Sequence, residues 1–362
     1  MISLFKVHIP DNLNKTLQSV FESGFISEGK QADDFERSFG NFIDNQNTCL
    51  VNSCTSALTL AYRVSDIQPG DEIIVTPLTC MATNEPAHLM GAKLVWADID
   101  PMTGNIDPDD VKKKITRNTK AISAVHWAGQ PFEIDEINKI AKENNIKVIE
   151  DAAHATGATY RGKPIGTHSD YVCFSFQAIK HLTTGDGGAI SCQSEEDANR
   201  IRKLRWFGLD RKFPHSKWTQ DIAESGYKFH MNDINASIGL RQMEHIDSIV
   251  QRHKDNSRFY DEFINNKKVI KMSRNDYSES ACWIYTVRVQ DREHFKSYLL
   301  DKGIASDPVH VRNDKYSVFE KFVPTENLKG TDEFCSQHIC IPVGWWLSQD
   351  ERNYIVETVN DY

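Results

Sequence analysis

The chain has 362 residues, a length that fits two or at most three domains of roughly 150 residues each. Its 51 acidic residues outnumber the 42 basic ones, which leaves a formal net charge of −9 at pH 7. A general nucleic-acid binder needs a basic face, so this balance argues against nucleic acid as a partner. Hydrophobic residues make up 40% of the chain and charged residues 26%, as in an ordinary globular protein.

The chain carries no signal for export or for a membrane. No run of about 18 apolar residues occurs that could span a bilayer. The first residues, MISLFKVHIPDNLNKTL, lack an apolar stretch followed by a small-residue cleavage site. The eight cysteines are scattered, and Cys335 and Cys340 have no partner pair at metal-site spacing. We therefore expect a cytoplasmic protein with reduced cysteines and no bound metal.

Predicted strands and helices alternate from residue 50 to residue 192. Short apolar runs rich in β-branched residues predict strands at 72–77, 93–99, 121–127, 146–151, 171–176 and 188–192. Among the segments between them, 132–144 has apolar residues three and four positions apart, which predicts an amphipathic helix. Such alternation is typical of a mainly parallel sheet covered by helices on both faces.

The pattern changes after residue 195. The charged segment 233–266 has apolar residues at helical spacing and predicts a long helix. Strand-like runs follow at 283–289 and 338–343, with helical segments between them. We therefore divide the chain into a large domain, 1–250, and a small α+β domain, 251–362, joined by the long helix.

Two polar residues occupy positions where an open parallel sheet binds ligands, beyond the carboxyl ends of its strands. Asp151 ends the apolar run 146–151, where it can bind a ligand or simply cap a helix. Lys180 lies between the predicted strand 171–176 and the glycine-rich turn 185–188. A lysine after a strand is usually solvated, but one desolvated there has a lowered pKa and can form a Schiff base.

A third element is NSCTSAL at 52–58, which follows a short apolar run and opens an apolar helix. Small residues there leave backbone N–H groups free at a helix N-terminus, which binds phosphate; a ligand-free Ser/Thr cap explains the pattern equally well. Together, the three elements match the needs of pyridoxal 5′-phosphate. Its aldehyde needs a lysine, its ring nitrogen a carboxylate that keeps it protonated, and its phosphate an anchor.

Further motifs extend this pattern over nearly the whole chain. They are GFISEGKQADDFERSFGNF at 24–42, NSCTSAL, GDEIIVTPLTCMATNEP, VIEDAAHATGA, CFSFQAIKHLTTGDGGAI and GYKFHMNDINASIGLRQM. In this order and spacing they resemble the DegT/DnrJ/EryC1/StrS sugar aminotransferases. The resemblance implies an α/β fold of the pyridoxal-phosphate fold type I, like that of aspartate aminotransferase. Its large domain has a mainly parallel seven-stranded sheet, and its small C-terminal domain is α+β.

The resemblance also implies roles for individual residues around the cofactor. Lys180 would bind the cofactor as a Schiff base and then move the proton, while Asp151 would pair with the pyridine nitrogen. His154 would lie near the ring hydroxyl of the cofactor. The phosphate would be bound by Thr55, Ser56 and Ser175.

The chain departs from the family pattern at three positions. Cys80 stands where an aromatic residue usually stacks on the cofactor ring, so the stack must come from its sulfur, from Met81 or from elsewhere. Cys54 replaces the usual glycine or alanine of the phosphate motif. Lys228 replaces an asparagine that reaches the phosphate bound in the partner subunit. The resemblance thus implies a homodimer with shared active sites, to which Lys228 contributes an ammonium group.

Four residues are candidates for contact with the substrate: His310, Phe207, Arg211 and Trp345. His310 resembles a family histidine that faces the substrate, although a histidine at a strand start is commonly structural. Phe207 and Arg211 lie in a loop that the family uses near its active site. Trp345 belongs to an unusual tryptophan pair that can border the sugar-nucleotide cleft, although such a pair is mostly core or interface packing.

We expect an aminotransferase that moves an amino group from L-glutamate, through pyridoxamine phosphate, to a nucleotide-linked keto sugar. Its product would be an amino sugar for a surface polysaccharide or a glycoside. The alternatives are a pyridoxal-phosphate-dependent sugar dehydratase, a transaminase of a small phosphorylated ketone, and a catalytically silent protein of the same fold. A dehydratase variant of the family has histidine at the catalytic lysine, so the presence of Lys180 favours transamination.

Overall fold

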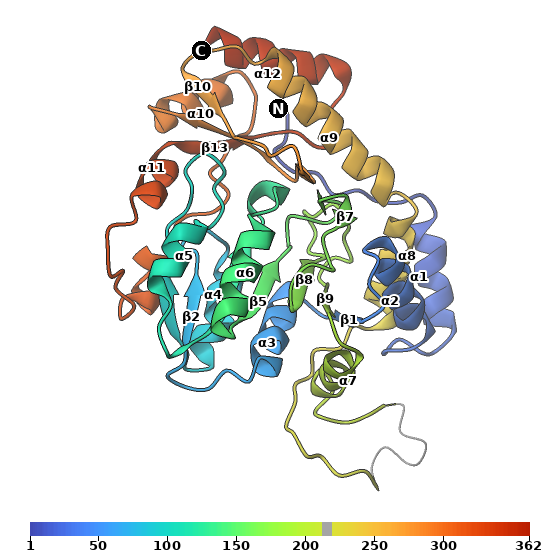
Figure 1. Ribbon diagram of the computed structural model, residues 1–362. Helices are drawn as coiled ribbons and strands as arrows, with labels where there is room; N and C mark the ends of the chain where they lie inside the picture. The colour runs from blue at the N-terminus through green and yellow to red at the C-terminus, as the bar shows by residue number, and fades with distance from the viewer. Residues whose placement is uncertain (212–218) are drawn as a thin grey trace.

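A seven-stranded sheet forms the centre of the molecule in this computed structural model, which describes residues 1–211 and 219–362 (Figure 1). In spatial order its strands are β1 (Thr48–Val51), β9 (Gly188–Cys192), β8 (Tyr171–Ser175), β5 (Lys147–Asp151), β4 (Thr119–Val125), β2 (Glu72–Val75) and β3 (Lys93–Trp96). Strand β9 is antiparallel to both neighbours, and the other strands run parallel to one another. The predicted mainly parallel sheet is therefore confirmed.

Helices cover both faces of this sheet. The helices that precede residue 245 are α1 (Leu13–Glu22), α2 (Lys30–Phe42), α3 (Cys54–Val64), α4 (Met81–Leu89), α5 (Pro108–Lys114), α6 (Ile134–Asn144), α7 (Glu195–Leu204) and α8 (Asp233–Met243). On one face, Phe39 of α2 and Ile137 of α6 are buried in one core. On the other face, Tyr62 of α3 and Ile201 of α7 are buried in a second core.

Helix α6 shows how the sequence pattern produces this packing. The helix predicted at 132–144 is present, and its Ile134, Ile137 and Ile140 are buried against the sheet. Burying one such side chain stabilises the fold by about 1.5–3 kcal/mol relative to leaving it exposed. Asn145 then adopts a left-handed conformation with φ 54°, a common way to end a helix.

The prediction of a single long helix at 233–266 is wrong, because the structure has two helices there. Helix α8 ends at Met243, and α9 (Ile246–Phe263) begins after His245, whose φ of −119° interrupts the helical path. The break redirects the chain between two cores. Val250 of α9 is buried in the core that α8 also contacts, whereas Tyr260 is buried in a separate core near the C-terminus.

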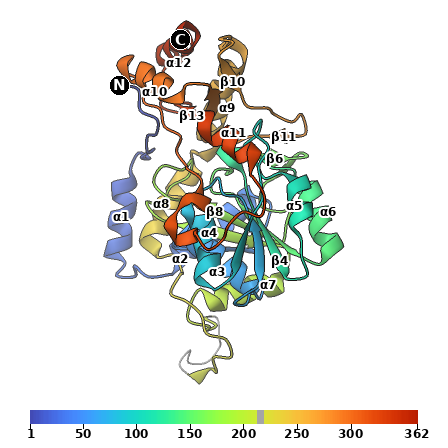
Figure 2. The same ribbon diagram turned by 90° about the vertical axis from the view of Figure 1, so that its left-hand side faces the viewer.

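That separate core surrounds a three-stranded antiparallel sheet near both termini (Figures 1 and 2). Its strands are β10 (Val269–Lys271), β12 (Tyr285–Val289) and β13 (His338–Ile341), and its helices are α10 (Arg292–Asp301), α11 (Lys329–Gln337) and α12 (Gln349–Asp361). A small third sheet joins β6 (Thr159–Tyr160), β7 (Lys163–Pro164) and β11 (Ser278–Glu279). The predicted domain boundary at 250/251 falls within α9 and stays a prediction. No helix in the described parts of the chain is long and apolar enough to cross a membrane.

A C-terminal segment returns to the central sheet and lies against the end of β2. Arg312 forms a β-bridge with Leu78, and the Asn313 N–H donates to the carbonyl of Pro77 over 2.7 Å. Short 3₁₀ turns shape the connections: η1 (Trp127–Gly129), η3 (Asn313–Lys315) and η4 (Ser317–Phe319). This return places His310 beside the carboxyl edge of the sheet.

Candidate active site

The predicted carboxylate, lysine and phosphate turn lie at one edge of the central sheet. Strands β1, β5 and β8 run in the same direction, so their carboxyl ends meet there. Strand β1 leads into the turn before α3, β5 ends at Asp151, and β8 ends at Ser175. Lys180 follows β8 in a tight turn in which its N–H donates to the carbonyl of Gln177 over 3.0 Å.

Asp151 is held in one orientation at the end of β5. Its side chain is buried, and its Oδ2 accepts a 2.6 Å hydrogen bond from the Thr83 hydroxyl. Its Oδ1 accepts the N–H of Ala153 over 3.0 Å. Thr83 in turn lies 2.7 Å, hydroxyl to hydroxyl, from Thr79. The fixed carboxylate can thus present a negative charge to a cationic ring nitrogen.

Lys180 is half-buried, and the groups packed around its amine partly desolvate it. Burial lowers the pKa of Lys180 to about 8, although the Asp151 carboxylate acts in the opposite direction. Its Nζ lies 3.6 Å from the centre of the Trp283 ring. A lysine whose pKa lies near the working pH can be a nucleophile and can both accept and return a proton.

His154 and His310 form a stacked pair beside the lysine. Their Nε2 atoms are 3.3 Å apart, and their rings are nearly parallel at 4°. Burial, with Lys180 second, lowers the pKa of His154 well below its usual value and that of His310 to about 3. Both rings are therefore neutral at neutral pH. The buried Nδ1 of His154 has no hydrogen-bond partner among the described residues, so it can serve a polar ligand atom.

The predicted phosphate turn has the geometry of a helix N-terminus. The Ser53 side chain caps α3 by accepting the N–H of Ser56, and Thr55 is exposed on the first turn. Ser56 itself is buried, and its hydroxyl donates to the Asn52 side chain over 2.7 Å. A Cβ at Gly188 would lie 2.6 Å from the carbonyl carbon of Ser53, so glycine allows β9 to approach this turn.

Two further predicted positions border this edge. Ser175 is buried, and its hydroxyl accepts the N–H of Gln177 over 3.3 Å. Cys80 is exposed and, with Met81, His310 and Tyr316, lines a cavity of about 370 Å³. A cavity of this size can hold a small molecule.

Lys228 lies in the chain between α7 and α8, five residues before α8 begins at Asp233. Its side chain is exposed, and its Nζ lies 3.1 Å from the centre of the Trp206 ring. A β-bridge joins Trp206 to Lys228. The Asn52 N–H donates to the carbonyl of Phe229 over 2.7 Å. The segment therefore adjoins the phosphate turn of its own chain.

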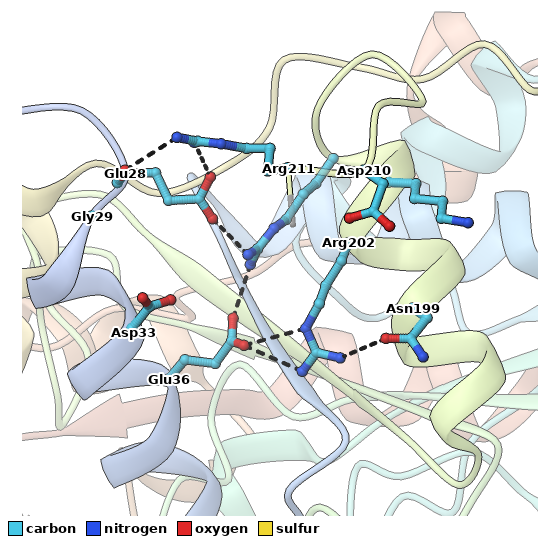
Figure 3. A pocket seen from close by; sticks show the side chains of 10 residues that line it. Glu28, Gly29, Asp33, Glu36, Asn199, Arg202, Asp210 and Arg211 are labelled. Atoms are coloured by element: carbon cyan, nitrogen blue, oxygen red, sulfur yellow. Dashed lines mark hydrogen bonds and ion pairs between the residues drawn. The ribbon is translucent and has the colours of Figure 1, made fainter. Parts of the chain in front are cut away.

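Arg211 belongs to a different cavity, of about 410 Å³, that is lined mostly by charged residues (Figure 3). Its guanidinium pairs with Glu28. Glu28 also accepts from Arg205, which is largely buried and pairs with Glu36 over 2.9 Å. Arg202 completes the network by pairing with Glu36 over 3.2 Å. This network joins the loop before α2 to the end of α7, so Arg211 has a structural role beside its predicted one.

Replacing Glu36 with glutamine is expected to destabilise the protein by about 3 kcal/mol, because buried Arg205 loses part of its countercharge. Burial opposes ionisation of Glu36, but Arg205 and Arg202 hold its pKa below the usual value. The ion pairs therefore stabilise the fold at neutral pH, and this contribution is lost as the pH falls through the pKa of Glu36.

Urea unfolding measures this effect. Asp34→Asn on the same helix is the control, since its partner Lys30 is exposed and such pairs contribute about 0–1 kcal/mol. Equal effects of the two substitutions, or a Glu36→Gln effect that does not shrink in acid, would contradict the assignment.

The other two substrate candidates contact residues outside the lysine site. Phe207 has a left-handed φ of 57° and is 47% exposed, with its ring 5.7 Å from that of Trp206. The ring of Trp345 lies 5.0 Å from that of His8, with Lys6 over it at 5.8 Å. Their roles toward a substrate stay predictions.

Sequence reasoning missed two residues of the site. Thr83 orients Asp151 but lies 68 positions away in the chain, on a different element. Trp283 contacts Lys180 and stacks on His154, with ring centres 3.9 Å apart. The one signal for it in the sequence was the residue type, because a buried tryptophan needs a hydrogen-bond acceptor for its indole N–H and is therefore fixed in place. In the sequence it appeared only as the start of a strand.

The residues present fit pyridoxal 5′-phosphate. A desolvated lysine, a fixed carboxylate, an unpartnered imidazole nitrogen and a helix N-terminus match its aldehyde, ring nitrogen, hydroxyl and phosphate, respectively. Such a site at the carboxyl edge of a mainly parallel seven-stranded sheet defines a pyridoxal-phosphate enzyme of fold type I.

The comparisons with known proteins specify the family. Residues 8–360 match the DegT/DnrJ/EryC1/StrS aminotransferase family, and the chain belongs to it. A relative in Campylobacter jejuni, UDP-4-amino-4,6-dideoxy-N-acetyl-beta-L-altrosamine transaminase, is 32% identical over 96% of this chain and 93% of its own.

Two solved structures have the same fold over the whole chain. The sugar aminotransferase CalS13 from Micromonospora echinospora is 37% identical, with a TM-score of 0.96 and full coverage of both chains. The PMP form of Spr1654 from Streptococcus pneumoniae is 28% identical, with a TM-score of 0.93, and the match covers 100% of this chain and 98% of its own. A PLP form of Spr1654 is also known.

Proposed function

We propose that this aminotransferase transfers an amino group from L-glutamate to a nucleotide-linked keto sugar, in the cytoplasm, for the synthesis of a surface polysaccharide or a glycoside. The observation that carries the proposal is Lys180, whose amine is desolvated at the sheet edge that also holds the Asp151 carboxylate. The family and the named substrate of the Campylobacter jejuni relative support a sugar nucleotide as acceptor.

Each of the site residues has a separate role in such a transfer. When bound, pyridoxal phosphate supplies the electron sink for breaking a C–H bond of the donor. The neutral amine of Lys180 takes that proton and later returns it, since its lowered pKa permits both steps near neutral pH. The Asp151 carboxylate holds a proton at the ring nitrogen, and the N-terminus of α3 binds the phosphate.

The cavity beside Cys80 is where we place the acceptor sugar. It opens next to His310, and neutral His310 can donate or accept one hydrogen bond to a sugar hydroxyl without adding charge. The sequence favoured transfer over the dehydratase alternative because Lys180 is retained, and the same residue supports it here.

A screen tests this function. Purified enzyme is incubated with L-glutamate and a panel of nucleotide-linked keto sugars, and the products are read by mass. Formation of the amino sugar together with 2-oxoglutarate is the expected result. Loss of water without amine transfer would indicate a dehydratase, and conversion only of a small phosphorylated ketone would replace the sugar as acceptor. A protein that forms none of these products, and that shows no visible Schiff-base band when pyridoxal phosphate is added without an amino donor, would be catalytically silent.

We further propose that the working unit is a homodimer in which Lys228 contacts the cofactor phosphate of the partner subunit. The exposure of Lys228 supports this role, because an exposed side chain can reach a second subunit. An ammonium group offers up to three donors and a full charge to a phosphate dianion. Such charge-assisted contacts are roughly twice as strong as neutral ones.

Mixing Lys180→Ala and Lys228→Ala chains is expected to restore part of the activity and of the tight cofactor binding. If Lys228 acts across the interface, both defects of a mixed dimer fall in one site and the other site is intact. If it acts within its own chain, each site keeps one defect and nothing is restored. A Lys228→Ala homodimer that binds the cofactor as tightly as wild type would rule out the role.

A further inference from the structure

Trp283 is anchored beside Lys180 at both its backbone and its indole. Its side chain is 2% exposed, and its Nε1 donates to the carbonyl of Ile179 over 2.9 Å. Its backbone N–H donates to the carbonyl of Ala128 over 3.0 Å. The indole is therefore bonded to the residue just before the lysine and cannot rotate away without losing a buried hydrogen bond.

The backbone around Trp283 is strained on both sides of this contact. Cys282 has a φ of 53° and Ala128 a φ of 56°, a left-handed conformation that costs energy for residues other than glycine. A second backbone bond, from the Ala281 N–H to the carbonyl of Gly129 over 3.1 Å, ties these two strained turns together. Such strain persists where the surrounding structure overdetermines it, often at functional sites.

The ring of Trp283 faces the reactive group of the site. The Nζ of Lys180 lies 3.6 Å from the ring centre, within the range of a cation–π contact, and tryptophan is the strongest aromatic partner for such contacts. His154 stacks on the same indole at 3.9 Å with 19° between the planes. One side chain thus contacts both the lysine and the histidine predicted to serve the cofactor.

We propose that Trp283 is a positioning residue that holds the amine of Lys180 over its ring, and stabilises its ammonium form, whenever the lysine is not bonded to the cofactor. A transaminase needs such a resting place, because its lysine is released in each half of the reaction and must stay oriented to carry the proton. The inference rests on the proposed role of Lys180 as the reactive amine.

The proposed role predicts in which direction the Trp283 ring shifts the pKa of Lys180. Burial lowers the pKa of Lys180, whereas the face of an aromatic ring favours the charged form and so raises it. The other titratable groups that face the amine are Asp151, Cys54, Cys80, His154, His181 and His310. Replacing Trp283 with leucine keeps an apolar neighbour but removes the ring, so the pKa of Lys180 should fall further.

Competitive acetylation of the cofactor-free enzyme measures this effect without any turnover. Acetic anhydride reacts with the neutral amine, and the extent of labelling on the peptide that carries Lys180 is followed by mass against pH. We expect the midpoint for Trp283→Leu to lie about one pH unit below that of wild type, the size of a desolvated cation–π contact. Trp283→Phe keeps a ring face and should shift the midpoint by less than about half a unit.

Phe5→Leu serves as the packing control, because the ring of Phe5 stacks on that of Trp283 with 5.1 Å between the ring centres. This variant is expected to leave the labelling midpoint of Lys180 unchanged. Equal midpoints for wild type and Trp283→Leu, or an upward shift, would overturn the proposal, since the indole would then act only as packing. If Trp283→Leu fails to fold, a labelling midpoint for Trp283→Phe that differs from wild type by more than one pH unit would also overturn the proposal. Borohydride labelling of a lysine other than Lys180 would instead refute the proposed function, and it would leave these midpoints unaffected.

Discussion

Replacing Lys180 with alanine is expected to lower turnover by at least about 10⁴-fold, the upper range for loss of a general acid–base group. The variant loses both the amine that binds the aldehyde and the group that moves the proton. Its desolvated position explains why solvent cannot substitute: water that enters has neither the lowered pKa nor the fixed orientation of this amine.

Two measurements check this prediction. Borohydride reduction of the wild-type enzyme should fix the cofactor on the peptide that contains Lys180, with loss of the visible band. Lys180→Arg is the matched variant: it keeps the positive charge but cannot release its proton, and we expect it to be equally inactive. Lys139→Ala, at an exposed surface lysine, should retain wild-type turnover. A reduced cofactor on any other lysine would show that the assignment is wrong.

Asp151→Asn is expected to turn over about 10²–10³ times more slowly than wild type while still becoming yellow with the cofactor, since it removes one preorganised charge. The amide oxygen can accept the N–H of Ala153, and the amide nitrogen can donate to the Thr83 hydroxyl, which then donates to Thr79, so the local geometry is kept. What the amide cannot do is stabilise a protonated ring nitrogen. The loss should therefore appear in the proton-transfer step and hardly in cofactor binding.

Single-turnover kinetics with deuterated donor separate these steps, and an enlarged isotope effect is the expected result. Asp170→Asn provides the control, because Asp170 pairs with the exposed Lys147 at the opposite end of β5. Near-wild-type turnover of Asp151→Asn would remove the carboxylate from the mechanism. Weakened cofactor binding with unchanged chemistry would make it an anchoring group only.

The positions of Asp151, Lys180 and the phosphate turn could be predicted because each follows a strand that the local sequence specifies. The apolar runs at 146–151 and 171–176 correspond to β5 and β8, whose ends the structure places at one edge. Parallel topology then brings their carboxyl ends together whatever the details of packing. Helix α6 could be predicted for the same reason, since its apolar spacing is a local property.

The break between α8 and α9 could not be predicted, because the helical spacing of apolar residues continues across it. Met243 and Ile246 are three positions apart and fit one uninterrupted helix. The chain changes direction there because Val250 and Tyr260 are buried in two separate cores, and only the assembled molecule defines where those cores lie.

Side-chain partners across the chain were likewise decided by the tertiary structure alone. Glu28 and Arg211 are 183 positions apart, and Trp283 reaches the carbonyl of Ile179 from 104 positions away. No local pattern encodes such pairs, because they depend on how separate elements pack. The sequence by itself thus determined that Asp151, Lys180 and the phosphate turn follow strands of the central sheet. Packing decided that Thr83 donates a hydrogen bond to the Asp151 carboxylate and that the indole of Trp283 lies against the amine of Lys180.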